Sequence, residues 1–259
     1  MHLIIDCSYV VYYRYHALSV WYKHSKQEVG PNHGDIMSDV DFLERYQRLF
    51  IQAIKKLKKT YGTEKVYFAT DCHSSCMWRR MIYPEYKANR SSNGKFDKNI
   101  FGYVYEEILP MIEGGIVLGV EGAEGDDIIY VLKRFIRERE EEAEIVIISS
   151  DADMGQLWDD RCNIIDMKGK NMVITDAKNS LMKKIIGGDK SDNIKPIVSR
   201  FEKGELDKLK CDTDELEGFL TKGGDDVRDR YEMNKTLIDM DCIPSDMYKS
   251  IFLSIYNTV

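Results

Sequence analysis

Four short runs of almost uninterrupted apolar residues constrain the fold more than any other feature of the chain. They cover residues 2–6, 65–71, 116–120 and 144–149. Continuous apolar strands of this kind are typical of a parallel sheet that is buried on both faces. Between them, residues 39–60 and 126–141 carry apolar side chains at helical spacing. The alternation predicts an α/β fold with a mostly parallel central sheet flanked by helices.

The remaining segments suggest how the chain is divided. Residues 163–167 and 172–175, with Lys168-Gly169 between them, predict a hairpin at the edge of the sheet. The polar stretch 19–38 predicts a loop. Strand patterns stop near residue 180. We therefore expect an α/β domain over residues 1–180 and a helical subdomain over residues 181–259.

Length and composition exclude several classes of protein. The 259 residues are enough for one large α/β domain or a domain with a small appendage. Hydrophobic residues make up 43% and charged residues 31%, a balance that argues against disorder. No apolar stretch is long enough for a membrane span, and no basic segment precedes the first apolar run. The six cysteines show no metal-finger spacing, so we expect reduced thiols in a cytoplasmic protein.

The charge is distributed unevenly along the chain. The net charge of −7 argues by itself against a nucleic-acid partner. Residues 39–95, however, carry 12 Lys and Arg against 6 Asp and Glu, whereas residues 96–200 carry 14 against 21. A basic segment is therefore followed by an acidic one, and asymmetry of this kind points to charged partners.

Acidic residues follow the ends of four predicted strands. Asp6 and Asp71 end two of the runs, and Asp151 follows a third, with Asp153 two residues later. Glu124, Asp126 and Asp127 follow the remaining strand through a short turn. The carboxyl ends of parallel strands share one edge of a sheet, where ligands bind. The sequence therefore predicts a cluster of carboxylates in one crevice.

Such a cluster needs protons or cations. Two carboxylates about 4 Å apart repel by roughly 4 kcal/mol at an effective dielectric constant near 20. Oxygen ligands without His or Cys suit hard cations such as Mg²⁺ or Mn²⁺. Two such ions about 4 Å apart are the usual arrangement for cleaving phosphodiesters.

Each acid also has a structural interpretation. Asp126, Asp127 and Asp153 suit helix N-termini, and Asp6 could begin a turn. Asp189 and Asp192, three residues apart in GDKSDN, are typical of a polar turn. Four successive strands that end in acids favour the metal interpretation for the first group.

Five blocks of the chain resemble the landmark motifs of the 5′→3′ exonuclease and flap endonuclease family, in that family's order. They are LIIDCSYVVYYRYHAL, FATDCHSSCMWRRMIYPEYKANR, EGAEGDDIIYVL, IVIISSDADMGQL and GGDKSDNI. Together they cover about residues 2–194. The stretch RYEMNKTLIDMDCIPSDM is similar to the T-even phage branch of the same family.

The resemblance implies two divalent metal sites, with Mg²⁺ as the cofactor and Mn²⁺ as a substitute. The first metal would be held by Asp6, Asp71, Glu124, Asp126 and Asp151. The second would be held by Asp153, Asp189 and Asp192. Asp127 matches the second Asp of the family's acidic doublet, which is either a ligand or a partner of one.

The resemblance also implies a nucleic-acid surface. The stretch equivalent to residues 76–100, within a block at about 72–100, forms a helical arch in the family. Lys87 and Arg90 match its basic gateway residues and would hold the scissile phosphate. Arg79 and Arg80 would contact the strand backbone, and Tyr83 and Tyr86 would stack on bases.

The implied function is a metal-dependent, structure-specific 5′ nuclease that acts in DNA replication or repair. Its expected partners are DNA with 5′ flaps or nicks and RNA–DNA duplexes, bound by a monomer through a helix–turn–helix-like subdomain. A single-strand-binding protein or a sliding clamp is a further candidate. Many members have a Gly-rich turn and a K⁺ site after GDxSDN. Here the chain reads IKPIVSRFEKGE, so K⁺ is a weaker expectation than Mg²⁺.

Three other interpretations stay open. A PIN-type single-stranded ribonuclease shares the general fold and an acidic cluster, but it usually lacks the YPEYKANR and GDKSDN blocks. A phosphatase of the haloacid-dehalogenase kind needs an Asp where this chain has Ser8. A non-catalytic DNA-junction binder would bind flaps without cutting them.

Overall fold

The computed structural model describes residues 1–25, 36–90 and 96–259. Within them, five strands form one parallel sheet in the order β3-β2-β1-β4-β5. The strands are β1 (His2–Asp6), β2 (Val66–Ala69), β3 (Gly115–Leu118), β4 (Ile145–Ile148) and β5 (Cys162–Ile165). The predicted mostly parallel sheet flanked by helices is confirmed. Because the chain leaves β1 toward β2 and later returns to β4, the strand order reverses at β1.

The chain packs into two compact units, and each is assembled from separate stretches. The first unit contains Met1–Cys72, Ser92–Met172 and Ile251–Val259. The second contains His73–Ser91 and Val173–Ser250. The two units therefore interleave along the chain, and the predicted domain boundary between residues 180 and 181 stays a prediction.

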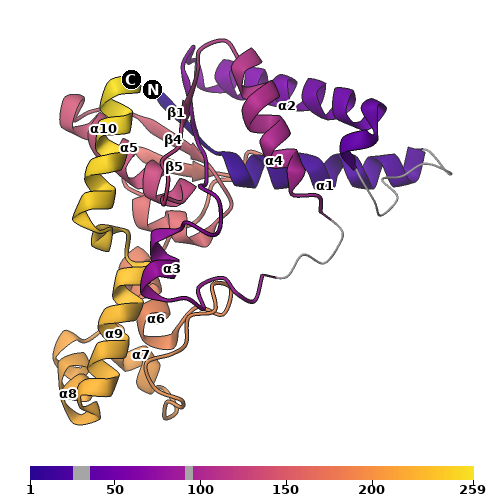
Figure 1. The fold of residues 1–259 in the computed structure, drawn as a ribbon. Helices are drawn as coiled ribbons and strands as arrows, with labels where there is room; N and C mark the ends of the chain where they lie inside the picture. Colours follow the sequence, from indigo (N-terminus) through magenta and orange to yellow (C-terminus); the bar gives the residue numbers. More distant parts are fainter. Residues whose placement is uncertain (26–35, 91–95) are drawn as a thin grey trace. The chain divides into compact units, whose positions relative to one another are not determined.

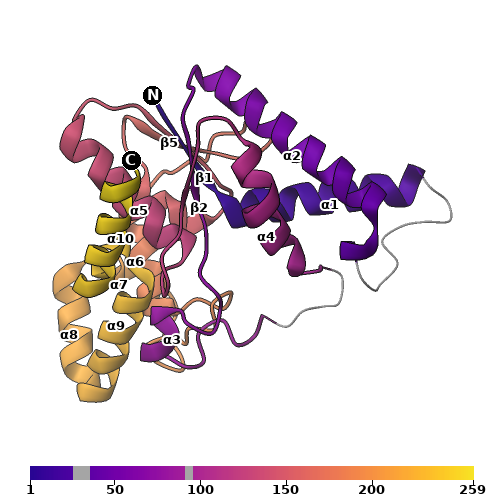
Figure 2. The same cartoon turned by 45° about the horizontal axis from the view of Figure 1, so that its top comes forward.

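Helices cover both faces of the sheet in the first unit (Figure 1). Leu3 and Ile5 of β1 join the apolar side chains of three helices in one core. Their neighbour Ile4 points to the other face, because side chains alternate along a strand. A fourth helix packs against the sheet on that face (Figure 2). The helices of the first face are α1 (Cys7–Ser25), α2 (Val40–Tyr61) and α4 (Asn99–Tyr103), and that of the second is α5 (Gly125–Arg139). Short helical turns are η1 (Ile36–Ser38), η2 (Val104–Ile108), η3 (Leu109–Met111) and η4 (Ala152–Leu157).

The sequence of α2 explains its bounds. The Asp39 side chain accepts a hydrogen bond from the Phe42 N–H at 2.9 Å, which satisfies one of the unpaired donors of the first turn. Gly62 ends the helix in the left-handed conformation with φ 59°, which glycine adopts without strain. Between these ends, Phe42, Tyr46 and Phe50 recur every four residues and are buried. One face of the helix therefore belongs to the core of the sheet.

The second unit is helical in the part of it that the structure describes. Its helices are α3 (Trp78–Ile82), α6 (Ala177–Gly187), α7 (Glu205–Leu209), α8 (Thr213–Gly223) and α9 (Asp225–Ile238), followed by η5 (Met240–Cys242) and the start of α10 (Ser245–Thr258). Gly224 joins α8 to α9 with φ 77°. Asn234 of α9 is fully buried, and its amide donates to the carbonyls of Ile185 and Lys195, each at 2.9 Å. A single side chain therefore fastens α6 and the following loop to α9.

The predicted loop over residues 19–38 is wrong for residues 19–25 and 36–38. Residues 19–25 continue α1, because the Tyr22 ring is buried with its centroid 5.8 Å from that of Phe42. Residues 36–38 form η1. Residues 26–35 lie outside the described part of the chain.

The predicted hairpin is also incomplete. Residues 172–175 form no strand, and one isolated antiparallel bridge joins Ile165 to Asn171. The Asp166 carboxylate accepts from the N–H groups of Lys168 and Lys170, at 2.8 and 2.9 Å. These two N–H groups bond to a side chain and not to the backbone of a neighbouring strand. Asp side chains in turns often compete with a strand ladder in this way.

The predicted arch block contains little helix in the residues that the structure describes. Between residues 73 and 90 only α3 is helical, and turns follow it. Pro84 explains the end of α3, because a proline disfavours helical backbone in the residue before it. Residues 91–95 of the block lie outside the described residues.

Two expectations about the whole chain can be compared with the structure. None of the six cysteines forms a disulfide. In the described ranges, no helix is both long enough and apolar enough to cross a membrane.

The buried amide of Asn234 generates a stability prediction. Asn234→Leu keeps a side chain of similar size but leaves two inward-facing carbonyls without their donors. We expect the free energy of unfolding to fall by about 2 kcal/mol, measured by urea denaturation. Asn257→Ala, at an exposed position of α10, is the control and should change it by less than about 0.5 kcal/mol. Equal effects of the two substitutions would contradict the role assigned to Asn234.

Candidate functional site

Three predicted metal ligands lie at the carboxyl ends of neighbouring strands of the first unit. Asp6 is the last residue of β1, Asp71 follows β2 and Asp151 follows β4. β1 is bonded to both β2 and β4, so these acids come from the point where the strand order reverses. This is the place where open α/β sheets bind ligands.

Protein donors hold the carboxylates of Asp6 and Asp71. Asp6 accepts from the Tyr9 N–H at 3.0 Å and from the Ser149 hydroxyl at 2.7 Å. Asp71 accepts from the Gly125 N–H at 2.6 Å and from the Ser8 hydroxyl. The two serines were not among the predicted site residues. Ser8 follows β1 in the sequence DCS, and Ser149 follows β4 in the sequence ISS. These positions beside strand ends are the signal that could have found them.

Ser149 also connects two of the acids. It is buried, donates to Asp6, and accepts from the Asp151 N–H at 3.1 Å. Asp151 is exposed, and its carboxylate accepts from the Asp153 N–H at 2.9 Å, which caps η4. The structure therefore brings Asp6, Asp71 and Asp151 to one edge, with Asp153 two residues beyond Asp151 in the first turn of η4.

The environment of Asp6 disfavours its ionised form. Burial first, and then the charges of Asp71 and Asp151, raise the pKa of Asp6 to about 7, against the lowering effect of its two hydrogen bonds. The neighbouring Cys7 thiol has a raised pKa for the same reasons, with burial first and the charges of Asp6 and Asp71 next. A bound cation would reverse this effect, since it favours ionised carboxylates.

The acidic doublet begins helix α5. Glu124 is the N-cap, and its N–H donates to the Asp127 carboxylate at 3.0 Å in a capping box. Asp127 is completely buried, whereas Asp126 is half-buried. The structural interpretation of a helix N-terminus therefore describes Glu124 and Asp127, and the metal-ligand roles of the doublet stay predictions.

The described carboxylates are not arranged as a finished metal centre. Among residues 1–25, 36–90 and 96–259, no three His, Cys, Asp or Glu side chains are grouped as metal ligands. The oxygens of Asp6 and Asp71 face serine hydroxyls and main-chain N–H groups instead. The ligands nevertheless fit a hard divalent cation in their chemistry, because they are carboxylate oxygens whose charges repel one another.

The other predicted ligands lie in the second unit, where cations surround them. The Asp189 carboxylate is 2.8 Å from the Lys184 ammonium and accepts from the Ser191 hydroxyl at 2.6 Å. Burial opposes its ionisation, but Lys184 and Ser191 together hold the pKa of Asp189 below its usual range. Asp192 contacts two predicted phosphate-binding residues, with the Arg90 guanidinium at 2.5 Å and the Lys87 ammonium at 3.9 Å.

Two residues that were predicted to contact nucleic acid are buried in the second unit. Tyr86 is only 3% exposed, so its ring has no free face on which a base could stack. Arg79 is 5% exposed, and its Nε donates to the Leu237 carbonyl at 2.9 Å while the guanidinium lies over the Trp78 ring. Amphipathic side chains can serve the core as well as a surface, and here packing determines their position. Arg80 and Tyr83 are half-buried, and their predicted roles stay predictions.

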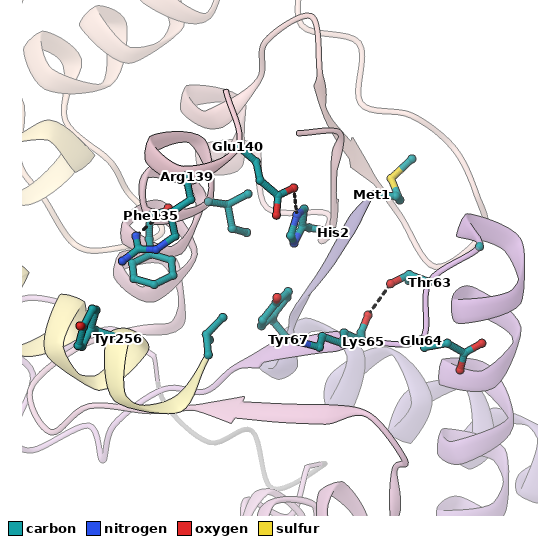
Figure 3. Close-up of a pocket in the computed structure, with 13 residues that line it drawn as sticks. Met1, His2, Thr63, Glu64, Lys65, Tyr67, Phe135, Arg139, Glu140 and Tyr256 are labelled. Atoms are coloured by element: carbon teal, nitrogen blue, oxygen red, sulfur yellow. Dashed lines mark hydrogen bonds and ion pairs between the residues drawn. The ribbon is translucent and has the colours of Figure 1, made fainter. Parts of the chain in front are cut away.

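A cavity of about 590 Å³ lies elsewhere in the first unit (Figure 3). Its walls come from the start of β1, the turn before β2, and the ends of α5 and α10. They include His2, Lys65, Tyr67, Arg139, Glu140 and Tyr256. Because it lies at the amino ends of the strands, it is separate from the carboxylates at their carboxyl ends.

The buried carboxylate of Asp6 generates a prediction about pH. The ordinary pKa of Asp is about 3.9, so the folded chain binds this proton more tightly than the unfolded chain. Ionisation of Asp6 therefore opposes folding between about pH 4 and pH 7, and the full effect is present above pH 7. In EDTA, Asp6→Asn should be more stable than the parent by up to a few kcal/mol at pH 8, and equally stable at pH 3.5.

Urea unfolding at several pH values measures this difference. Glu121→Gln, at an exposed acid beside the same edge, is the control and should follow the parent throughout. A constant difference between Asp6→Asn and the parent at pH 3.5 and pH 8 would contradict the assignment.

Comparisons with known proteins agree on one family. Residues 1–185 match the model of the 5′-3′ exonuclease N-terminal resolvase-like domain. The ribonuclease H of Enterobacteria phage T4 is 28% identical over 248 residues, which cover 83% of this chain and 78% of that protein. A 5′-3′ exonuclease of Mycoplasmopsis pulmonis is 33% identical over 171 residues, covering 62% of this chain and 56% of that one.

A solved structure supports the same assignment at the level of the fold. The 5′-exonuclease of phage T5, in a structure with bound zinc, superposes with a TM-score of 0.70 at 15% identity and covers 99% of this chain and 98% of that one. The similarity to the T-even phage branch, inferred from the sequence, is confirmed. This chain belongs to the 5′-3′ exonuclease family and is a nuclease.

Proposed function

We propose that this nuclease hydrolyses phosphodiester bonds near free 5′ ends with the help of two divalent cations. The observation that carries the proposal is the placement of Asp6, Asp71 and Asp151 at the switch point of the sheet, with Asp6 buried and its pKa raised. Groups held in an unfavourable charge state at a ligand-binding edge are candidates for function. Oxygen-only ligands favour Mg²⁺, with Mn²⁺ as a substitute.

Each part of the site would have a separate task. Asp6, Asp71 and Asp151, together with Glu124 and Asp126, would hold the first ion. Divalent cations in such a site polarise the phosphate and lower the pKa of water for in-line attack. Ser8, Ser149 and the Gly125 N–H orient the carboxylates. Asp153 stays a predicted ligand beside Asp151, and Asp189 and Asp192 stay predicted ligands on the resemblance alone.

The phosphate would be bound by this chain's own cations. Lys87 and Arg90 would hold the scissile phosphate and offset the negative charge that develops on it. Hydrolysis with this polarity leaves a 5′-phosphate and a 3′-hydroxyl.

The proposed substrates are 5′-flap and nicked DNA and RNA primers paired to DNA. The T4 relative is named a ribonuclease H, which supports activity on RNA–DNA duplexes. A T5 flap endonuclease variant with the same fold was solved with DNA and metal ions, at a TM-score of 0.65 and 14% identity. Removal of RNA primers during replication is the task that would combine both substrates.

A cleavage assay tests the proposal. A duplex with a labelled 5′ flap and a matched RNA-primed duplex are incubated with Mg²⁺ or with EDTA, and the products are sized. We expect Mg²⁺-dependent cuts near the junction, or short 5′ products from the primer. Cleavage of single-stranded RNA with intact flaps would favour the PIN-type alternative. Binding without cleavage would favour a junction binder.

A substitution in the acidic doublet sharpens this test. Asp126→Asn removes one charged ligand without a change of shape. We expect the cleavage rate in Mg²⁺ to fall at least about a hundredfold, beyond the effect of losing an outer-shell partner, while flap binding persists. Glu121→Gln on the same loop is the matched control and should cut normally. A cleavage rate near that of the parent for Asp126→Asn would show that Asp126 is not a ligand.

A further inference from the structure

Two segments of the second unit are fastened to each other by hydrogen bonds. Residues 83–90 carry the predicted phosphate-binding cations, and residues 188–195 form the GDKSDN loop. The Lys87 N–H donates to the Asp192 carbonyl at 2.9 Å, and the Asn89 amide donates to the Lys190 carbonyl at 2.8 Å. In the opposite direction, the Asn193 amide donates to the Glu85 carbonyl at 2.8 Å. The two segments therefore form one structural element.

The Asp192 carboxylate lies beside two positively charged side chains of this element. One oxygen accepts from the Arg90 guanidinium at 2.5 Å. The other accepts from the Tyr86 hydroxyl at 3.1 Å and lies 3.9 Å from the Lys87 ammonium. The side chains of Asp192 and Lys87 are only 14% and 12% exposed. One carboxylate is thus the counter-ion of both predicted phosphate-binding cations.

The backbone holds Lys87 in the same place. Lys87 has φ 54°, a left-handed conformation that a non-glycine residue rarely adopts. Its N–H is bonded to the Asp192 carbonyl, and its ammonium lies 4.9 Å from the centroid of the Tyr86 ring. The main chain and the side chain of Lys87 therefore both contact Asp192.

We infer that Asp192 is a positioning residue that holds Lys87 and Arg90 in the protein without nucleic acid, and that a strand phosphate must displace its carboxylate to bind them. The inference rests on the proposed function, because it takes these two cations as the phosphate contacts. The two anions compete for the same donors, so the ion pairs lower the affinity for nucleic acid until they are exchanged.

The neighbouring acid of the same loop provides a matched control. Asp189 also carries a negative charge and is also partly buried. Its ion-pair partner is Lys184, which is not a predicted phosphate contact. A general electrostatic effect on DNA binding would be the same for both acids, whereas competition for Lys87 and Arg90 belongs to Asp192 alone.

The test measures binding of a fluorescent 5′-flap duplex in EDTA, where no divalent ion takes part and no cleavage occurs. Asp192→Asn should bind about five- to tenfold more tightly than the parent, and its affinity should fall more steeply with salt because more cations reach phosphates. Asp189→Asn should gain less than about twofold. Arg90→Gln should weaken binding of Asp192→Asn more than it weakens binding of the parent, because in the parent Arg90 must first leave the Asp192 carboxylate.

Each alternative outcome overturns the inference. Equal gains for the two Asn variants would mean a general charge effect. Unchanged or weaker binding by Asp192→Asn would mean that its carboxylate does not compete with the strand for these cations. If Asp192→Asn does not fold, Asp192→Ser takes its place in the same comparison, and an unchanged affinity of that variant overturns the inference. If no form binds the flap, the proposed function fails. A double-mutant cycle of Arg90→Gln and Asp192→Asn, measured as free energies of unfolding, then tests whether the two side chains interact. Additive effects would show that they do not.

Discussion

The burial of the Asp6 carboxylate beside Asp71 and Asp151 is the constraint on which the first unit depends. β1 is the middle strand of a sheet covered by helices on both faces, so an acid at its end leaves water. Two hydrogen bonds offset only part of the resulting free-energy penalty, since the pKa of Asp6 stays raised. Local arrangements that oppose stability in this way are retained where they serve function. The unfavourable position of this acid thus follows from the order of the strands, because the parallel sheet places the carboxyl end of its central strand between two neighbours.

The predicted ligands of the second unit have the opposite electrostatic state. Asp189 and Asp192 are each paired with lysine or arginine, and the pKa of Asp189 is lowered. A cation added to the Asp6 group relieves repulsion, whereas a cation added to Asp192 must first replace an existing partner. Similar residue types with similar predicted roles would therefore differ in how readily they exchange ions. This difference follows from neighbouring charges, which the residue type alone does not reveal.

Strand positions could be predicted from the sequence because uninterrupted apolar runs leave few alternatives for buried backbone. The acids at strand ends followed from the same pattern. The features that the sequence did not indicate concern residues whose position is set by distant partners. Residues 19–25 are polar on average, yet Tyr22 packs on Phe42 and extends α1. Tyr86 and Arg79 are suited to a nucleic-acid surface by type, yet both are buried in the second unit. Ser8 and Ser149 lie beside strand ends in the sequence, but only the alignment of the strands shows which acid each one bonds.

The interleaving of the two units along the chain has a consequence for folding during synthesis. When residue 172 has been added, most of the first unit is present, but residues 73–91 still lack the rest of their unit. Trp78 and Tyr86, both buried in the finished protein, would lack the rest of their unit to pack against in this interval. Chains emerge at about 5–20 residues per second, so the interval lasts for seconds. The segment that carries Lys87 and Arg90, the predicted phosphate-binding cations, is therefore among the last to acquire its structure.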